Sequence, residues 1–334
     1  MTGAVSLPFL IGLIAVALAF DFLNGLHDTA NSIATLVSTR MLRPRYAVIW
    51  AAFFNFIAFL VFGVHVARTM GIGIVSAQVM DARVICSALL GAIFWDLITW
   101  WGGIPSSSSH ALIGGLVGAG VVKAGIGAIV WQGLALTAAF IVLSPLLGFF
   151  LALLFVLAVS WGFAASNPRT VEPTFQWLQF AAASLISLGH GGNDAQKTMG
   201  IIAVLLFSQG YLGGEFYVPF WVVITCQTAM ALGTFIGGWR IVRTVGSKIT
   251  RLTPVQGCCA SAAGAIMLIA ATFLGIPVST THTVTGSVIG VGAARKVSAV
   301  RWNIAGNIVV AWILTLPASA LMAVLCYFLL GAFR

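Results

Sequence analysis

Charged residues are scarce in this chain. Lysine, arginine, aspartate and glutamate make up 7% of its 334 residues, whereas 60% are hydrophobic. An ordinary soluble domain has about a quarter of its residues charged. The low content of charged residues therefore excludes an ordinary soluble domain. A mean hydropathy of +1.08 indicates an integral membrane protein with the lipid bilayer as its solvent.

Cysteine is also sparse, and nothing in the sequence calls for a cofactor. Five cysteines lie within apolar runs at spacings that match no thiolate metal motif, so we interpret them as small core residues. The first 20 residues lack the basic segment and the cleavage site of a signal peptide. They are expected to begin the first helix of the mature protein.

The apolar runs predict an all-α integral membrane protein with about 10–12 transmembrane helices. A helix needs about 20 residues to cross the hydrocarbon core. Suitable runs cover 8–39, 46–66, 84–101, 105–122, 128–160, 175–208, 217–239, 254–274, 277–294 and 302–331. The first, fifth and sixth are too long for one straight helix and contain glycine, proline or charged residues. We therefore expect breaks in these three.

The basic residues indicate topology and not a nucleic-acid partner. The formal charge is +9, but these residues form no continuous patch. If the N-terminus lies outside, the cytoplasmic loops receive Arg40, Arg43, Arg45, Arg169, Arg240, Arg243, Lys248, Arg251, Arg295, Lys296 and Arg301. The outer side receives Arg68, Arg83, Lys123 and Arg334. This asymmetry satisfies the positive-inside rule with both termini outside.

One polar sequence occurs twice inside the apolar runs. The first copy, at 24–32 (NGLHDTANS), is followed by GIPSSSSH at 103–110. The second copy, at 190–197 (HGGNDAQK), is followed by GIPVSTTH at 275–282. Ionisable groups inside a membrane are expensive and mark functional sites. Their duplication is typical of a secondary transporter built from two related halves.

The two copies divide the chain into two repeats. The first is expected to cover 1–160 and the second 175–334, with a cytoplasmic linker at 161–174. Five passes in each repeat is an odd number, so the second copy enters the membrane from the side opposite to the first. We therefore expect inverted repeats with broken helices, and equivalent motifs that meet near the bilayer midplane.

These motifs resemble the inorganic phosphate transporter family, often called Pit. The resemblance rests on 24–40 (NGLHDTANSIATLVSTR), 190–202 (HGGNDAQKTMGII) and the two Pro-Ser/Thr-His segments, and it spans essentially the whole chain. It implies import of orthophosphate with a coupling cation, and it marks Asp28 and Asp194 as functional. A bacterial inner membrane is the expected location, and assembly into a homo-oligomer is left open.

The two Pro-Ser/Thr segments carry the physical argument for an anionic substrate. Proline suits the first turn of a new helix, and the hydroxyl residues that follow cap it or donate outward. Free amides and the helix dipole then form an anion site. The predicted substrate-binding residues are Ser106, Ser107, Ser108, Ser109, Ser279, Thr280, Thr281, Asn31, Asn193 and Lys197. The alternative is that these hydroxyls bond only to their own backbone or to a neighbouring helix.

Asp28 and Asp194 are expected to bind the coupling cation, and they are also the candidate metal ligands. A carboxylate beside phosphate would repel it, so a proton or a metal ion is expected near both acids. Asn24 is expected to join them through its amide, which suits an unwound segment of a broken helix. The alternative is that the acids only hold helices together.

Histidine is the side chain best suited to proton handling near neutral pH. The repeated motifs contain His27, His110, His190 and His282. We expect His110 and His282 to take part in coupling. The alternative is that they are simply hydrogen-bonded.

The coupling ion is least constrained by the sequence. Sodium-coupled members of the family carry an acidic residue in the segment that matches Phe54–Phe56, where this chain has Asn55. The difference favours proton symport or transport of a neutral metal-phosphate complex, with sodium kept open. The sequence also leaves open transport of a different tetrahedral oxyanion such as arsenate, a channel, or an intramembrane hydrolase. Because the adjacent Ser109 and His110 would point about 100° apart on a helix, no enzyme activity is expected.

Overall fold

The computed structural model describes residues 5–332, with the backbone alone at 168 and 169, and these residues contain no β-strand. The first half has α1 (Leu7–Ser38), α2 (Pro44–Ile57), η1 (Ala58–Leu60), α3 (His65–Ile72), α4 (Ala82–Gly102), α5 (Ser108–Ala124), η2 (Ile126–Ala128) and α6 (Trp131–Gly162). The second half has α7 (Pro168–Ser208), α8 (Phe220–Ile236), α9 (Trp239–Arg243), the π-helix η3 (Thr244–Lys248), α10 (Pro254–Phe273), α11 (Thr280–Arg295), η4 (Val297–Ala299) and α12 (Trp302–Ala332). The expected all-α fold is confirmed.

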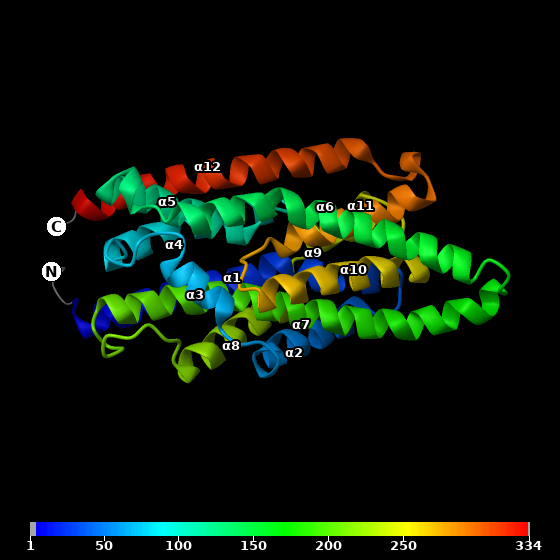
Figure 1. The fold of residues 1–334 in the computed structure, drawn as a ribbon, viewed down its shortest axis with the longest axis horizontal. Coiled ribbons are helices and arrows are strands. Elements are labelled where there is room, and N and C mark those ends of the chain that lie inside the picture. The colour runs from blue at the N-terminus through cyan, green and yellow to red at the C-terminus, as the bar shows by residue number, and fades with distance from the viewer. Residues whose placement is uncertain (1–4, 333–334) are drawn as a thin grey trace.

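The two halves repeat one order of helices in opposite orientation. The helices α6, α7 and α12 run along the length of the molecule, whereas α4 and α5 lie at its left and α10 and α11 at its right (Figure 1). The pairs α4–α5 and α10–α11 each pack together as a helical hairpin. The hairpins therefore enter from opposite ends, as inverted repeats require.

Each hairpin turns at a Gly-Ile-Pro sequence. Gly103 and Gly275 have φ angles of 64° and 69°, a left-handed conformation that glycine adopts without strain. The amide of Gly103 donates to the carbonyl of Trp100 at 3.0 Å, and that of Gly275 donates to Thr272 at 3.1 Å. The same sequence thus builds the same turn twice.

The hairpins reduce the number of separate crossings below the ten expected runs. The helices α5 and α11 contain 17 and 16 residues, which at 1.5 Å per residue is too short for the hydrocarbon core. By length and composition, five of the described helices qualify as spans, or seven if each bent helix pair is one span. Apolar composition predicted these segments correctly, but it does not say whether a chain crosses the membrane or turns back.

The helix breaks lie elsewhere than expected. The runs expected to be interrupted form the continuous helices α1, α6 and α7, of 32, 32 and 41 residues. Glycine in α1 serves close packing instead: a Cβ added at Gly25 would lie 2.1 Å from the carbonyl oxygen of Met230. The side-chain amides of Asn24, Asn31 and Asn193 therefore lie on regular helices and not in unwound segments. The helix α7 also begins at Pro168, earlier than the expected start at 175.

Two sharp bends occur instead after α2 and after α8. The segment Pro44–Leu60 meets α3 at 84°, and α8 meets Trp239–Lys248 at 61°. Thr69 of α3 donates to the carbonyl of Gly275 at 2.8 Å, and Thr244 of η3 donates to that of Gly103 at 3.1 Å. Each bent helix of one half thus holds the hairpin turn of the other half.

The connections at the two ends differ in charge. The connections at 39–43, 163–167, 249–253 and 296–301 lie at the right of Figure 1, opposite the end where α1 begins and α12 ends. Most of the basic residues assigned to the cytoplasm lie in or beside these connections. We call this the basic end. Arg334, expected at the other end, lies outside the described residues.

Candidate substrate and cation site

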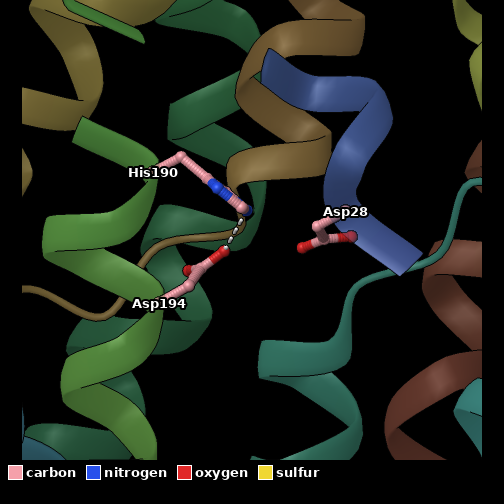
Figure 2. A group of neighbouring side chains, drawn as sticks. All are labelled: Asp28, His190 and Asp194. Atoms are coloured by element: carbon pink, nitrogen blue, oxygen red, sulfur yellow. Dashed lines mark ion pairs between the residues drawn. The ribbon is translucent and has the colours of Figure 1, made fainter. Parts of the chain in front are cut away.

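Two acidic residues from different halves meet inside the protein. Asp28 on α1 and Asp194 on α7 have exposed fractions of 2% and 0%. Figure 2 shows them facing each other, with His190 of α7 beside Asp194. One ligand atom from each of the three residues lies within 4.8 Å of the others. The expected convergence of the two motif acids is thus present in the fold.

The beginning of α11 lies between the two carboxylates. The Thr280 hydroxyl lies 2.8 Å from Asp194 Oδ2 and 3.2 Å from Asp28 Oδ2. Thr281 donates to Asp28 Oδ1 at 3.0 Å. The amide nitrogen of Asn31 on α1 donates to both threonine hydroxyls, at 3.1 and 3.0 Å. The second hairpin is therefore attached to the acids of both halves.

The beginning of α5 approaches the same acids from the first hairpin. Ser108 donates to Asn24 Oδ1 at 2.5 Å and lies 3.3 Å from Asp28 Oδ2. The ammonium group of Lys197 forms an ion pair with Asp194 and donates to the hydroxyl of Ser109. It also donates to the carbonyl oxygen just before the second cap, that of Val278, at 2.7 Å. Lys197 therefore connects both hairpins to α7.

Both short helices direct their positive ends into this region. The side chain of Ser107 caps α5 by accepting from the amide of His110 at 3.2 Å, and Ser279 caps α11 in the same way from His282 at 3.2 Å. The amides that begin each helix have no acceptor within the helix. Together with the two helix dipoles they provide a positive potential suited to an anion.

Several predicted substrate residues support the hairpins and do not face the carboxylates. The hydroxyl of Ser106 lies 3.4 Å from that of Thr315 on α12. The side-chain oxygens of Ser107 and Ser279 are used in the caps. Asn193 accepts from the amide of Val278 at 3.3 Å and so fixes the second turn. Ser106, Ser107 and Ser279 lie in the turns just before α5 and α11, and residue type alone does not reveal which way a side chain in such a turn points.

His110 and His282 contact each other across the two halves. Their ring centroids are 4.5 Å apart in an edge-to-face arrangement, and His282 stacks on Trp312 at 3.8 Å. Both histidines are buried within the first turn of α5 or α11. Their contact joins the two hairpins beside the carboxylate site. Equivalent residues of the two repeats thus meet directly.

Sequence reasoning missed two further buried acids. Asp21 on α1 accepts from Thr198 of α7 at 3.0 Å, and Asp96 on α4 has no hydrogen-bond partner among the described residues. Both are acids within apolar runs, the signal that identified Asp28. Neither belongs to the repeated motifs, and for that reason neither was predicted.

The charges of this site favour joint occupancy by an anion and a cation. Asp28, Asp194 and Lys197 together carry one net negative charge when the histidines are neutral. A bound anion would add to that charge in a region of low dielectric, where uncompensated charge is expensive. Carboxylate and imidazole ligands suit a metal ion or a proton, and the helix ends suit an oxyanion.

Comparison with known proteins agrees with this geometry. The profile of the phosphate transporter family matches residues 24–323. The chain belongs to this family. It is therefore a transporter and not an enzyme, which removes the hydrolase alternative.

The similarity to individual relatives extends over nearly the whole length of this chain. A probable low-affinity inorganic phosphate transporter of Rhizobium meliloti is 70% identical over 328 residues, covering 98% of each chain. A protein with the same description from Bacillus subtilis is 44% identical, covering 96% of each chain. A solved structure described as the sodium-dependent phosphate transporter has a TM-score of 0.91 and 27% identity, covering 98% of this chain and 100% of the other.

Proposed function

We propose that this protein imports inorganic phosphate by cation symport, with alternating access around the site of Asp28 and Asp194. The observation that carries the proposal is the meeting of two capped helix ends, one from each half, at two buried carboxylates and one lysine. The relatives from Rhizobium meliloti and Bacillus subtilis are described as probable inorganic phosphate transporters, which supports this substrate.

The donors around the site suit a tetrahedral oxyanion. The hairpins, which enter from opposite ends, bring the first amides of α5 and α11 and the hydroxyls of Ser109, Thr280 and Thr281. The ammonium group of Lys197 comes from α7. Phosphate has four oxygens that accept hydrogen bonds, so donors from both halves are appropriate. Arsenate has nearly the same shape and charge and is the expected competitor.

We propose a proton or a metal-phosphate complex as the coupled species. The neutral Asn55 donates to Thr234 at 2.9 Å, and its oxygen lies 3.2 Å from His190 Nδ1. This position therefore supports His190 without adding a carboxylate for sodium. The nearby acids and His190 supply three potential ligands for a divalent ion. Sodium is the alternative, because the solved structural neighbour is described as sodium-dependent.

We propose that the basic end faces the cytoplasm and that both termini lie outside, in a bacterial plasma membrane. Cytoplasmic connections of membrane proteins are enriched in lysine and arginine. The repeats would then be 1–160 and 175–334. The linker proposed at 161–174 includes the short connection between α6 and α7 and the first turns of α7.

Phosphate uptake into proteoliposomes tests the function and the coupling ion together. Purified protein is reconstituted, and uptake of radiolabelled phosphate is followed under a proton gradient or a sodium gradient imposed separately. Saturable accumulation driven by the proton gradient is expected. Accumulation driven by sodium alone would reject the proposed coupling, and no saturable uptake under either gradient would reject phosphate transport. A parallel assay with a labelled divalent cation tests the metal-phosphate form.

A further inference from the structure

Asp96 is a buried acid that the phosphate site does not use. It lies on α4 with an exposed fraction of 1%, and neither carboxylate oxygen has a hydrogen-bond partner among residues 5–332. Asp28 and Asp194, by contrast, each contact several donors. An ionised carboxylate without partners is strongly disfavoured in a protein interior, and such groups become neutral instead. Asp96 therefore has the surroundings of a proton carrier.

The face of α4 that contains Asp96 reaches the phosphate site through one histidine. Thr99 lies one turn further along α4, and its hydroxyl is 3.1 Å from His27 Nε2. The other ring nitrogen of His27 is 3.1 Å from Asp28 Oδ1. This chain of contacts connects the turn of α4 that contains Asp96 with the carboxylate of Asp28.

A cavity lies beside this part of α4 and extends to Lys248, next to the connection at the basic end. It has a volume of about 590 Å³ and is lined on α4 by Trp95 and Thr99, the residues beside Asp96 and one turn beyond it. Lys248 of η3 and Asn307 of α12 also line this cavity. Asp96 itself does not line this cavity, so the turn of α4 that contains Trp95 and Thr99 separates its carboxylate from that space.

We propose that Asp96 carries the coupling proton during phosphate import. This inference rests on the proposed proton symport and assigns its proton to one residue. The proton binds a carboxylate oxygen of Asp96 while phosphate occupies the site, and it leaves to water at the basic end after phosphate is released. A neutral Asp96 does not repel phosphate, whereas an ionised one does. By linkage, proton and phosphate therefore stabilise each other's binding.

The other charged groups around α4 leave this assignment intact. The helix α4 packs against α1, α5, α7, α9 and α12, and α12 has no charged residue between Trp302 and Ala332. On α1, α5, α7 and α9, the charged or titratable residues in the parts near the site are the following: Asp21, His27, Asp28, His110, His190, Asp194, Lys197, Arg240 and Arg243. Asp194 and Lys197 pair with each other, and Arg240 donates to the Trp101 carbonyl at 2.5 Å. None of these pairs with Asp96.

The substitution Asp96→Asn separates transport from its coupling. Asparagine resembles the protonated acid, so the variant should still bind phosphate and cycle. In proteoliposomes we expect exchange of labelled internal for external phosphate within about twofold of wild type, but accumulation under a proton gradient reduced by about tenfold or more. Exchange should also lose its dependence on pH. The variant Asp96→Glu should recover part of the accumulation.

Asp81→Asn is the matched control, because it makes the same chemical change at the beginning of α4. Asp81 caps that helix and pairs with Lys123 near the surface, so both assays should stay close to wild type. Normal accumulation by Asp96→Asn would overturn the proposal. Loss of both exchange and accumulation would also overturn it, because that pattern indicates a structural role. If wild-type protein itself ignores the proton gradient, the symport proposal fails first, and the two failures are thereby distinguished.

Discussion

Asp28 and Asp194, one from each half of the chain, lie within hydrogen-bond distance of the same hydroxyl. Thr280 Oγ1 is 3.2 Å from Asp28 Oδ2 and 2.8 Å from Asp194 Oδ2. A hydroxyl has one hydrogen and donates to one of the two acids at a time. The acid that does not receive this hydrogen has an oxygen close to the hydroxyl oxygen without a hydrogen between them. A proton or a cation beside the two carboxylates would make that arrangement favourable. The geometry of this trio is thus the physical reason to expect cation coupling.

Removal of the Lys197 charge should destabilise the protein through Asp194. Both side chains are buried, and breaking a buried ion pair by removing one partner costs about 3–5 kcal/mol. Lys197→Met should therefore lower the thermal unfolding temperature in detergent. The double variant Lys197→Met with Asp194→Asn has no unpaired charge and should regain most of that stability without regaining transport. A double variant less stable than both single variants would contradict this account.

A divalent cation should stabilise the protein through Asp28, His190 and Asp194. Binding to the folded state adds about 2.7 kcal/mol at a cation concentration one hundred times the dissociation constant. We expect Mn²⁺ or Mg²⁺ to raise the unfolding temperature and a chelator to reverse the effect. His190→Gln should abolish most of the shift, whereas His65→Gln, outside this cluster, should keep it. An equal shift in both variants would show that the cation binds elsewhere.

The two threonine contacts at the hairpin turns should control access from opposite ends. Thr244→Val removes the hydrogen bond to Gly103, and Thr69→Val removes the bond to Gly275. Loss of such a hydrogen bond removes about 1 kcal/mol of stabilisation from the closed turn, which raises the population of molecules with that turn open about fivefold. With a cysteine at buried Ser106 and the native cysteines replaced by alanine, Thr244→Val should accelerate thiol labelling by about that factor. Thr69→Val should not, and equal acceleration by both would argue against separate gates.

Asn55 should influence the choice of cation through its contact with His190. Asn55→Asp keeps an acceptor for the ring but adds a negative charge beside the carboxylate cluster. We expect uptake by this variant to gain a dependence on sodium that wild type lacks. The measurement is initial uptake against sodium concentration at fixed pH and membrane potential. Asn307→Asp, which adds the same charge in the cavity at the basic end, is the control. Sodium dependence in both variants would assign the effect to charge alone.

The long apolar runs were enough to predict the all-α fold, and the repeated motifs were enough to predict its inverted halves and the meeting of Asp28 with Asp194. The bends after α2 and α8 were not predicted, although Gly63 and the pair Gly237 and Gly238 lie at them, because glycine in an apolar run also serves close packing. Hairpins could not be told from crossing helices, because both are equally apolar. The contact of Ser106 with Thr315 depends on the turn before α5, and the contact of His110 with His282 depends on how the two halves pack. Asp96 was not predicted because it has no counterpart in the second motif.

The most direct test of the central claim is uptake of radiolabelled phosphate by the purified, reconstituted protein beside Asp28→Asn and Asp194→Asn. The account predicts saturable, gradient-driven accumulation by wild type and loss of accumulation in both variants, with each variant still folded in detergent. Accumulation at the wild-type rate by both variants would contradict it.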